Sequence, residues 1–167
     1  MVESASGLRF KNSTTENISN KDIAKSAVDN SNLDMLLNDA ALSEKSLVNP
    51  EDRILVTDYI FIIMCQMVQF PFKNKENDRN ELALCCKHCM GKNGKGIFNR
   101  TKVTSISKNE FFKQIHSHIE NCSHCPDHLK EAIDQLKELH DIQKRKLKRG
   151  NRKEFFLRFL NRASFSN

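Results

Sequence analysis

Apolar residues gather in one long run near the middle of the chain and in shorter, spaced groups after it. The run ILVTDYIFIIMCQMVQF, residues 54–70, follows Asn49, Pro50 and two acidic residues, which are typical of a helix start, and ends at Pro71. It is slightly short for a membrane span and contains polar side chains. The pattern therefore predicts a buried core helix over residues 51–69 and no membrane segment.

The next segment, ELALCCKHCMGKNGKGIFNRT, has apolar flanks around a glycine-rich centre. This composition predicts a β-hairpin with a tight turn, which places a CxxC pair at the end of a strand. The polar residues 73–80 ahead of it are predicted to form a loop. Farther on, Ser107 and Glu110 match a capping box, which predicts that a helix begins there and continues over SKNEFFKQIHSHIENC.

Two more amphipathic helices are predicted in the C-terminal third. Pro126 and Asp127 mark the start of the first, and Gly150 marks its end. Its apolar residues recur on one side: Leu129, Ile133, Leu136 and Leu139. Asn151 is a suitable cap for the last helix, KEFFLRFLNR, whose apolar part consists of Phe155, Phe156, Phe159 and Leu160.

The N-terminal third differs from the rest in composition. Residues 1–48 are rich in Ser, Asn, Asp and Lys, which predicts a disordered tail, with at most a transient helix at 33–42. Residues 49–167 are predicted to form a single small domain of the α+β class, mostly α. Its parts are a core helix at 49–72, a finger at 80–125 and a helical C-terminal extension at 126–164.

The six cysteines change this picture because their chemistry depends on the compartment. The N-terminus, MVESASGLRF, lacks the apolar run of a secretory signal, so we expect a nuclear or cytoplasmic protein that is not secreted. A reducing compartment disfavours structural disulfides and favours metal binding or free thiols.

Four of the cysteine and histidine residues have the spacing of a tetrahedral zinc site. Cys86 and Cys89 form a CxxC pair, and His118 and Cys122 form an HxxxC pair after 28 intervening residues. A CxxC pair at a strand end can direct two sulfur atoms at one ion, and residues four apart on a helix project from the same side. The sequence therefore predicts a hairpin and a helix that hold Zn²⁺ through these four side chains.

Helix geometry separates the histidines. Ile115, His118 and Cys122 lie along one apolar face, whereas His116 lies about 200° around the helix from His118 and is expected to be solvated. His88, inside the CxxC loop, is expected to point outward. The remaining histidines are expected on the surface: His124, His128 and His140.

Other cysteines leave alternatives open. Cys125 completes a second CxxC pair with Cys122 and could replace His118 as the fourth ligand. Cys85 alternates to the opposite face of a regular strand, and Cys65 is expected to be a small buried hydrophobe. A redox role for the first CxxC pair would need a helix N-terminus, where the helix dipole lowers the thiol pKa, but a glycine-rich hairpin follows instead.

Positive charge is concentrated near the C-terminus, where residues 126–167 contribute +5 of the net charge of +6. The segment KRKLKRGNRK contains seven basic residues and no acid, enough for several phosphate contacts: Lys144, Arg145, Lys146, Lys148, Arg149, Arg152 and Lys153. The same run would also suit a nuclear-import signal or the solvated end of a helix, where cations complement the dipole.

The order of these motifs over residues 52–163 resembles an uncharacterised zinc-finger-like family that is abundant in diatoms. The family pattern is CxHC, HxxxC followed by CP, and a basic segment before a Phe-Phe pair; it is matched here by Cys86, Cys89, His118, Cys122, Cys125, Pro126, Phe155 and Phe156. The metal motif is more loosely similar to BED-type fingers, DNA-binding modules of transposases and chromatin proteins. Leu82, Ala83 and Leu84 stand where BED fingers have aromatic residues. The resemblance implies a zinc-binding fold and no established activity.

No feature of the chain indicates an enzyme. It has no nucleophile motif, and GKNGKG lacks the residue order of a phosphate-binding loop. We therefore expect a structural zinc module that binds nucleic acid, in a regulatory or mobile-element-derived nuclear protein. The alternative is a protein-interaction module, in which the surface around Phe155, Phe156 and Phe159 docks a partner and the basic run serves only for import.

Overall fold

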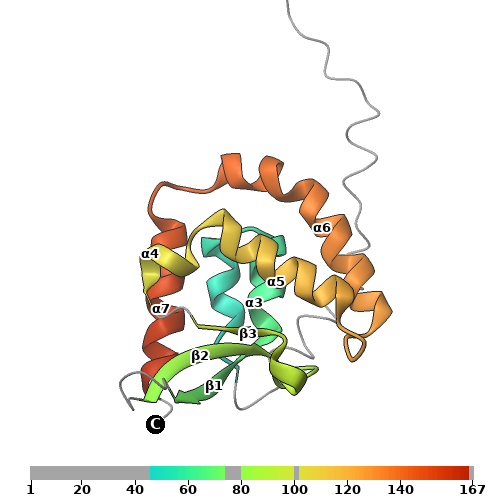
Figure 1. Cartoon of the computed structure of the whole chain (residues 1–167). Coiled ribbons are helices and arrows are strands. Elements are labelled where there is room, and N and C mark those ends of the chain that lie inside the picture. Colours follow the sequence, from blue (N-terminus) through green and yellow to red (C-terminus); the bar gives the residue numbers. More distant parts are fainter. Residues whose placement is uncertain (1–45, 74–79, 100–101, 166–167) are drawn as a thin grey trace, which may run out of the picture.

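Helices make up most of the structure, and a three-stranded antiparallel sheet lies across one end of them (Figure 1). The computed structural model describes residues 46–73, 80–99 and 102–165. The fold is α+β and mostly α, as the sequence predicts. Within the described ranges, no helix has the length and apolar character that crossing a membrane would require.

The predicted core helix over 51–69 is wrong in extent, because this segment forms three elements. A 3₁₀ helix, η1 (Pro50–Leu55), is followed by α3 (Asp58–Cys65) and then by strand β1 (Met67–Lys73). Val56 is extended between the two helices, and the hydroxyl of Thr57 accepts the Ile60 N–H at 3.4 Å as the cap of α3. A continuous apolar run does not distinguish a buried helix from a buried strand, so the sequence pattern could not locate this change.

The sheet has the order β1-β2-β3, with β2 (Asn80–Cys86) in the centre and β3 (Ile97–Phe98) at one edge. The predicted hairpin is confirmed as β2 and β3, with Leu84 opposite Phe98. Strand β1 was not expected. It contains Pro71, which pairs with Leu82 on an edge strand, where a proline without an N–H is tolerated. The predicted loop lies mainly at 74–79, outside the described residues.

A short helix, α4 (Val103–Ile106), precedes α5 (Asn109–Asn121). The predicted capping box at Ser107 is wrong, because Ser107 has helical backbone angles and ends α4. An N-cap residue needs an extended backbone, and that position is taken by Lys108, whose side chain makes no capping hydrogen bond.

The two C-terminal helices agree with the sequence pattern. They are α6 (Asp127–Lys146) and α7 (Asn151–Phe165), and Gly150 between them has a φ of +98° that favours glycine. Leu129, Ile133 and Leu136 are the buried residues of α6.

Phe155, Phe156 and Phe159 are completely enclosed in the core rather than exposed for a partner. Their rings pack together, with centroids 5.0 Å apart for Phe155 and Phe156, and Phe112 of α5 lies 5.7 Å from Phe156. The expectation that these three side chains form a docking surface is therefore wrong. Burial of these large apolar rings stabilises a small core, whereas exposing them to water would lose that free energy.

The chain segment ahead of η1 also belongs to the core. Leu47 and Val48 are buried, although the sequence pattern assigned them to the N-terminal tail. The rest of that predicted tail, including the possible helix at 33–42, lies outside the described residues.

A buried carboxylate joins this segment to α7. Asp52 is fully buried; its Oδ2 lies 2.5 Å from Arg162 Nη1 and accepts the Asn49 N–H at 3.1 Å. Arg162 Nη1 also donates to the Leu47 carbonyl at 3.1 Å. Arg158 is a weaker partner, with its Nη1 3.5 Å from Asp52 Oδ1. A buried charge without its partner is strongly destabilising, so Arg162 fixes the first and last described elements to each other.

We expect Arg162→Ala to lower the free energy of unfolding by about 2–3 kcal/mol, because a buried charged hydrogen bond is lost. Arg158→Ala should cost clearly less, since that guanidinium is more exposed and more distant from Asp52. Urea unfolding monitored by circular dichroism measures both. Equal losses would show that the Arg162–Asp52 pair does not anchor α7.

Candidate metal centre

The CxxC turn follows directly from strand β2. The Cys86 N–H donates to the Gly96 carbonyl at 2.9 Å, and the Met90 N–H donates back to the Cys86 carbonyl at 2.8 Å. The Lys92 N–H closes the next turn on the Cys89 carbonyl at 3.0 Å. These bonds hold the backbone around two buried thiols, Cys86 and Cys89.

Gln66, a buried residue between α3 and β1, binds this turn through hydrogen bonds. Its carbonyl accepts the Lys87 N–H at 2.8 Å, and its side-chain oxygen lies 3.0 Å from His88 Nε2. Its amide nitrogen donates to the Ile62 carbonyl at 2.9 Å. His88 is thus half-buried and bonded, not directed outward as expected. Burial and then the Lys87 charge lower the pKa of His88 to about 4, so its ring is neutral near pH 7.

The end of α5 supplies the other half of the cluster. His118 lies near the C-terminus of the helix, and Cys122 is its extended C-cap residue. The ring of Phe98 packs edge-on against His118, with centroids 6.0 Å apart. Burial lowers the pKa of His118, which favours the neutral imidazole that a metal ion needs.

The structure brings Cys86, Cys89, His118 and Cys122 together, with all four candidate ligand atoms within 4.8 Å of one another. Cys89 Sγ lies 3.4 Å from His118 Nε2. Two such ligands on one tetrahedral zinc ion would be about 3.6 Å apart, given the usual Zn–S and Zn–N bond lengths. The donor set and its spacing therefore fit a tetrahedral ion with little adjustment.

The Cys86 thiol is buried beside two other cysteines, so its thiolate form needs a compensating positive charge. The pKa of Cys86 is raised to about 12, mainly by burial; the N–H groups of Cys89 and His88 directed at its sulfur lower it, and the neighbouring Cys89 and Cys122 raise it. N–H groups directed at a sulfur favour the thiolate. A bound divalent ion would offset the cost of burying adjacent thiolates.

The remaining cysteines lie outside this set. None of the six forms a disulfide. Cys125 is buried, and its N–H donates to the Cys122 carbonyl at 3.1 Å, but it is not one of the four converging ligands. Burial raises the pKa of Cys125 and of Cys85 to about 11 and that of Cys65 to about 12.

Two histidines differ from the sequence-based expectation of solvated rings. His116 is only 3% exposed: Nδ1 lies 2.9 Å from the Tyr59 hydroxyl, and Nε2 lies 2.9 Å from a carboxylate oxygen of Asp134. His140 is half-buried, with Nδ1 2.8 Å from the Thr57 hydroxyl. Both rings contact residues of neighbouring elements. The angular position of a residue around its own helix does not show whether another element covers it. His124 and His128 are exposed, as expected.

The basic run lies at the end of α6, in the connection to α7, and at the start of α7. Six of its members are exposed: Lys144, Arg145, Lys146, Lys148, Arg149 and Lys153. Arg152 differs, because its guanidinium donates to Asn109 Oδ1 at 3.1 Å and packs 5.0 Å from the ring centroid of Phe112. Arg152 therefore ties α7 to α5 instead of joining the exposed basic group.

Comparison with known proteins gives no relative from which a function can be transferred. No protein-family model matches the chain, and neither a curated protein nor a solved structure matches it. The residues and their geometry therefore carry the functional argument.

Gly96 lies where any side chain would collide with the His118 imidazole. Its φ is +71°, and a Cβ added there would lie 2.5 Å from His118 Nε2 and 3.1 Å from Cys89 Sγ. Gly94 has the same φ, but an added Cβ would meet no atom within 4 Å. The two glycines therefore share a backbone requirement and differ only in contact with the cluster.

We expect Gly96→Ala to displace the His118 ring and to weaken divalent metal binding, whereas Gly94→Ala should keep the binding. Both variants carry the cost of a left-handed alanine, about 1–2 kcal/mol, so the difference between them isolates the steric effect at the cluster. Metal content per chain measures the effect on binding, and thermal unfolding measures the backbone cost. Equal metal content in both variants would contradict this role of Gly96.

Proposed function

We propose that Cys86, Cys89, His118 and Cys122 hold one structural Zn²⁺ ion. The observation that carries this proposal is the convergence of three buried thiols and an imidazole from two separate chain segments. Thiolate-rich, tetrahedral donor sets select zinc over harder divalent ions such as Mg²⁺ and Mn²⁺. Four protein ligands leave no position for water or substrate, so the ion would stabilise the fold and would not catalyse a reaction.

We further propose that the domain binds nucleic acid through the six exposed basic residues of 144–153, hereafter the basic surface. Their side chains are concentrated within ten positions, and no acidic residue lies among them. Long, exposed Lys and Arg side chains contact phosphates and release counterions, which gives affinity with little dependence on sequence. The same run would direct a nuclear location.

The packing of α7 weighs against the alternative of a protein-interaction module. The surface proposed for it required accessible phenylalanines, and the structure buries all three in the core. The basic surface remains exposed under either reading. Nucleic-acid binding is therefore the function that the described residues support best.

For the metal ion, we expect Cys89→Ala to lose zinc and to unfold the domain, because structural zinc supplies on the order of 10 kcal/mol of folding free energy. Cys125→Ala, at an equally buried cysteine, should retain one zinc ion per chain. Elemental analysis and circular dichroism test both. Zinc retained by the first variant, or lost by the second, would contradict the ligand set.

For nucleic acid, we expect a short DNA duplex of mixed sequence to bind at about 50 mM salt and to be released steeply towards about 200 mM. The double variant K148A/R149A should weaken binding and make the salt slope shallower by about 1.8, since each lost phosphate contact contributes about 0.9.

The matched control is K92A/K95A, which removes the same charge from exposed lysines of the CxxC turn and its continuation. Fluorescence anisotropy at several salt concentrations measures both variants. Absence of binding at low salt, or equal effects of the two double variants, would exclude the basic surface as the binding site.

A further inference from the structure

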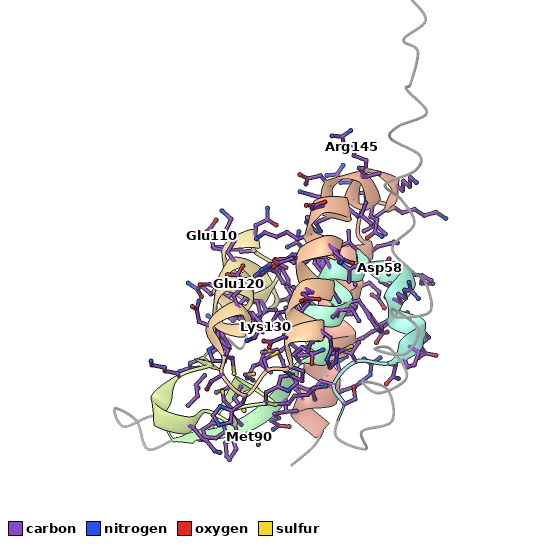
Figure 2. All side chains as sticks on the ribbon, turned by 90° about the vertical axis from the view of Figure 1, so that its right-hand side faces the viewer. Asp58, Met90, Glu110, Glu120, Lys130 and Arg145 are labelled. Carbon is purple, nitrogen blue, oxygen red and sulfur yellow. The ribbon has the colours of Figure 1, made fainter. Side chains whose placement is uncertain are left out.

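A second group of metal-ligating side chains lies between α5 and α6. His116 and Glu120 are one turn apart on α5, and Asp134 faces them from α6. His116 Nε2 is 2.9 Å from Glu120 Oε1 and 2.9 Å from Asp134 Oδ1, and the three ligand atoms lie within 4.8 Å of one another. Figure 2 shows the labelled Glu120 on the part of α5 that runs beside α6.

The ring of His116 is fixed by the opposite nitrogen. Nδ1 lies 2.9 Å from the hydroxyl of Tyr59, a buried residue of α3. Burial, followed by the charges of Glu120 and Asp134, raises the pKa of Tyr59 to about 12, so the hydroxyl keeps its proton. When Nε2 binds a metal ion, Nδ1 carries the ring proton and donates it to the Tyr59 oxygen. Such a hydrogen bond is the usual outer support of a metal-binding histidine, because it fixes the tautomer and the ring orientation.

The two distances from His116 Nε2 are close to those between adjacent ligands of an octahedral ion. Adjacent ligands of an octahedral ion with bonds of about 2.1 Å are about 3.0 Å apart, whereas tetrahedral nitrogen and oxygen ligands are about 3.3 Å apart. Both contacts of His116 Nε2 are close to the octahedral value. A single N–H can point directly at only one of the two carboxylate oxygens, whereas an ion among the three atoms would contact all of them.

We propose that His116, Glu120 and Asp134 form a second metal site, which binds an octahedral divalent ion of the first transition row, such as Mn²⁺, Fe²⁺ or Co²⁺. Three protein ligands occupy one face of the ion, and water occupies the other three positions. One imidazole and two carboxylates suit these ions better than the thiolate-rich cluster does, so the two sites select different metals.

Access to the site is consistent with ion exchange. The Glu120 and Asp134 side chains are 43% and 56% exposed, so an ion can enter from solvent while the buried imidazole stays in place. The bound ion would cross-link α5 to α6 and, through Tyr59, fix both relative to α3. This inference does not rest on the proposed zinc site or on nucleic-acid binding.

The test is a titration of the full-length protein, supplied with one equivalent of Zn²⁺, with Mn²⁺. The electron paramagnetic resonance signal of free Mn²⁺ measures binding, since thiolates have little affinity for this ion. We expect one Mn²⁺ bound per chain. Asp134→Asn and Glu120→Gln, which replace exposed carboxylates with neutral groups that can still accept a hydrogen bond, should weaken binding at least tenfold.

Two further variants test whether the effect is specific to the three ligands and whether Tyr59 orients His116. Glu138→Gln removes another exposed carboxylate of α6, one turn after Asp134, and should leave Mn²⁺ binding unchanged. Tyr59→Phe keeps all three ligands and should weaken binding about tenfold through loss of the orienting hydrogen bond. Absence of binding up to about 1 mM Mn²⁺, or wild-type binding by Asp134→Asn, would overturn the proposal and leave an ion pair between the helices.

Discussion

The turn after β2 and the end of α5 meet through three buried thiols and the partly buried imidazole of His118, and this contact constrains most of the fold. Cys86 is the last residue of strand β2, which pairs with both other strands. Cys122 is the C-cap of α5, a helix that packs on α3. The sheet is small, and β3 has only two residues, so strand pairing alone gives limited stability. A strong interaction at the turn therefore contributes to both the register of the sheet and the position of α5.

Helix α5 connects the parts of the molecule because several of its sides are occupied. Phe111 and Ile115 face the core, His118 and Cys122 face the CxxC turn, and His116 faces α3 and α6. The exposed residues of this helix are all polar. Polar contacts of His116 are satisfied at both ring nitrogens, which agrees with the rule that buried polar groups need partners.

Sequence reasoning located the α+β class, the hairpin, the later helices and the residues of the cysteine cluster, because each depends on local spacing. It failed where neighbours in space decide the outcome. Residues 67–69 were predicted as the end of the core helix because the apolar pattern is continuous there, but pairing with β2 makes them part of strand β1. His116 was predicted to be solvated because it lies on the side of α5 opposite the apolar face, and the prediction considered no other helix. The covering partners, Tyr59 and Asp134, come from distant positions, and no spacing in the sequence relates them to His116.

The metal centre and the basic surface lie far apart, which shapes how they can depend on each other. Figure 2 places the labelled Met90, which follows the CxxC pair, and Arg145 of the basic surface at opposite ends of the domain. In a recognition finger, the metal ion positions the contacting helix directly. Here the connection runs through α6, which packs on α3 and α5 before it reaches the basic end. A change at the cysteines that leaves this packing intact should therefore leave the basic surface in place. Metal ions would influence nucleic-acid binding through the stability of the helices and not through contact with phosphate.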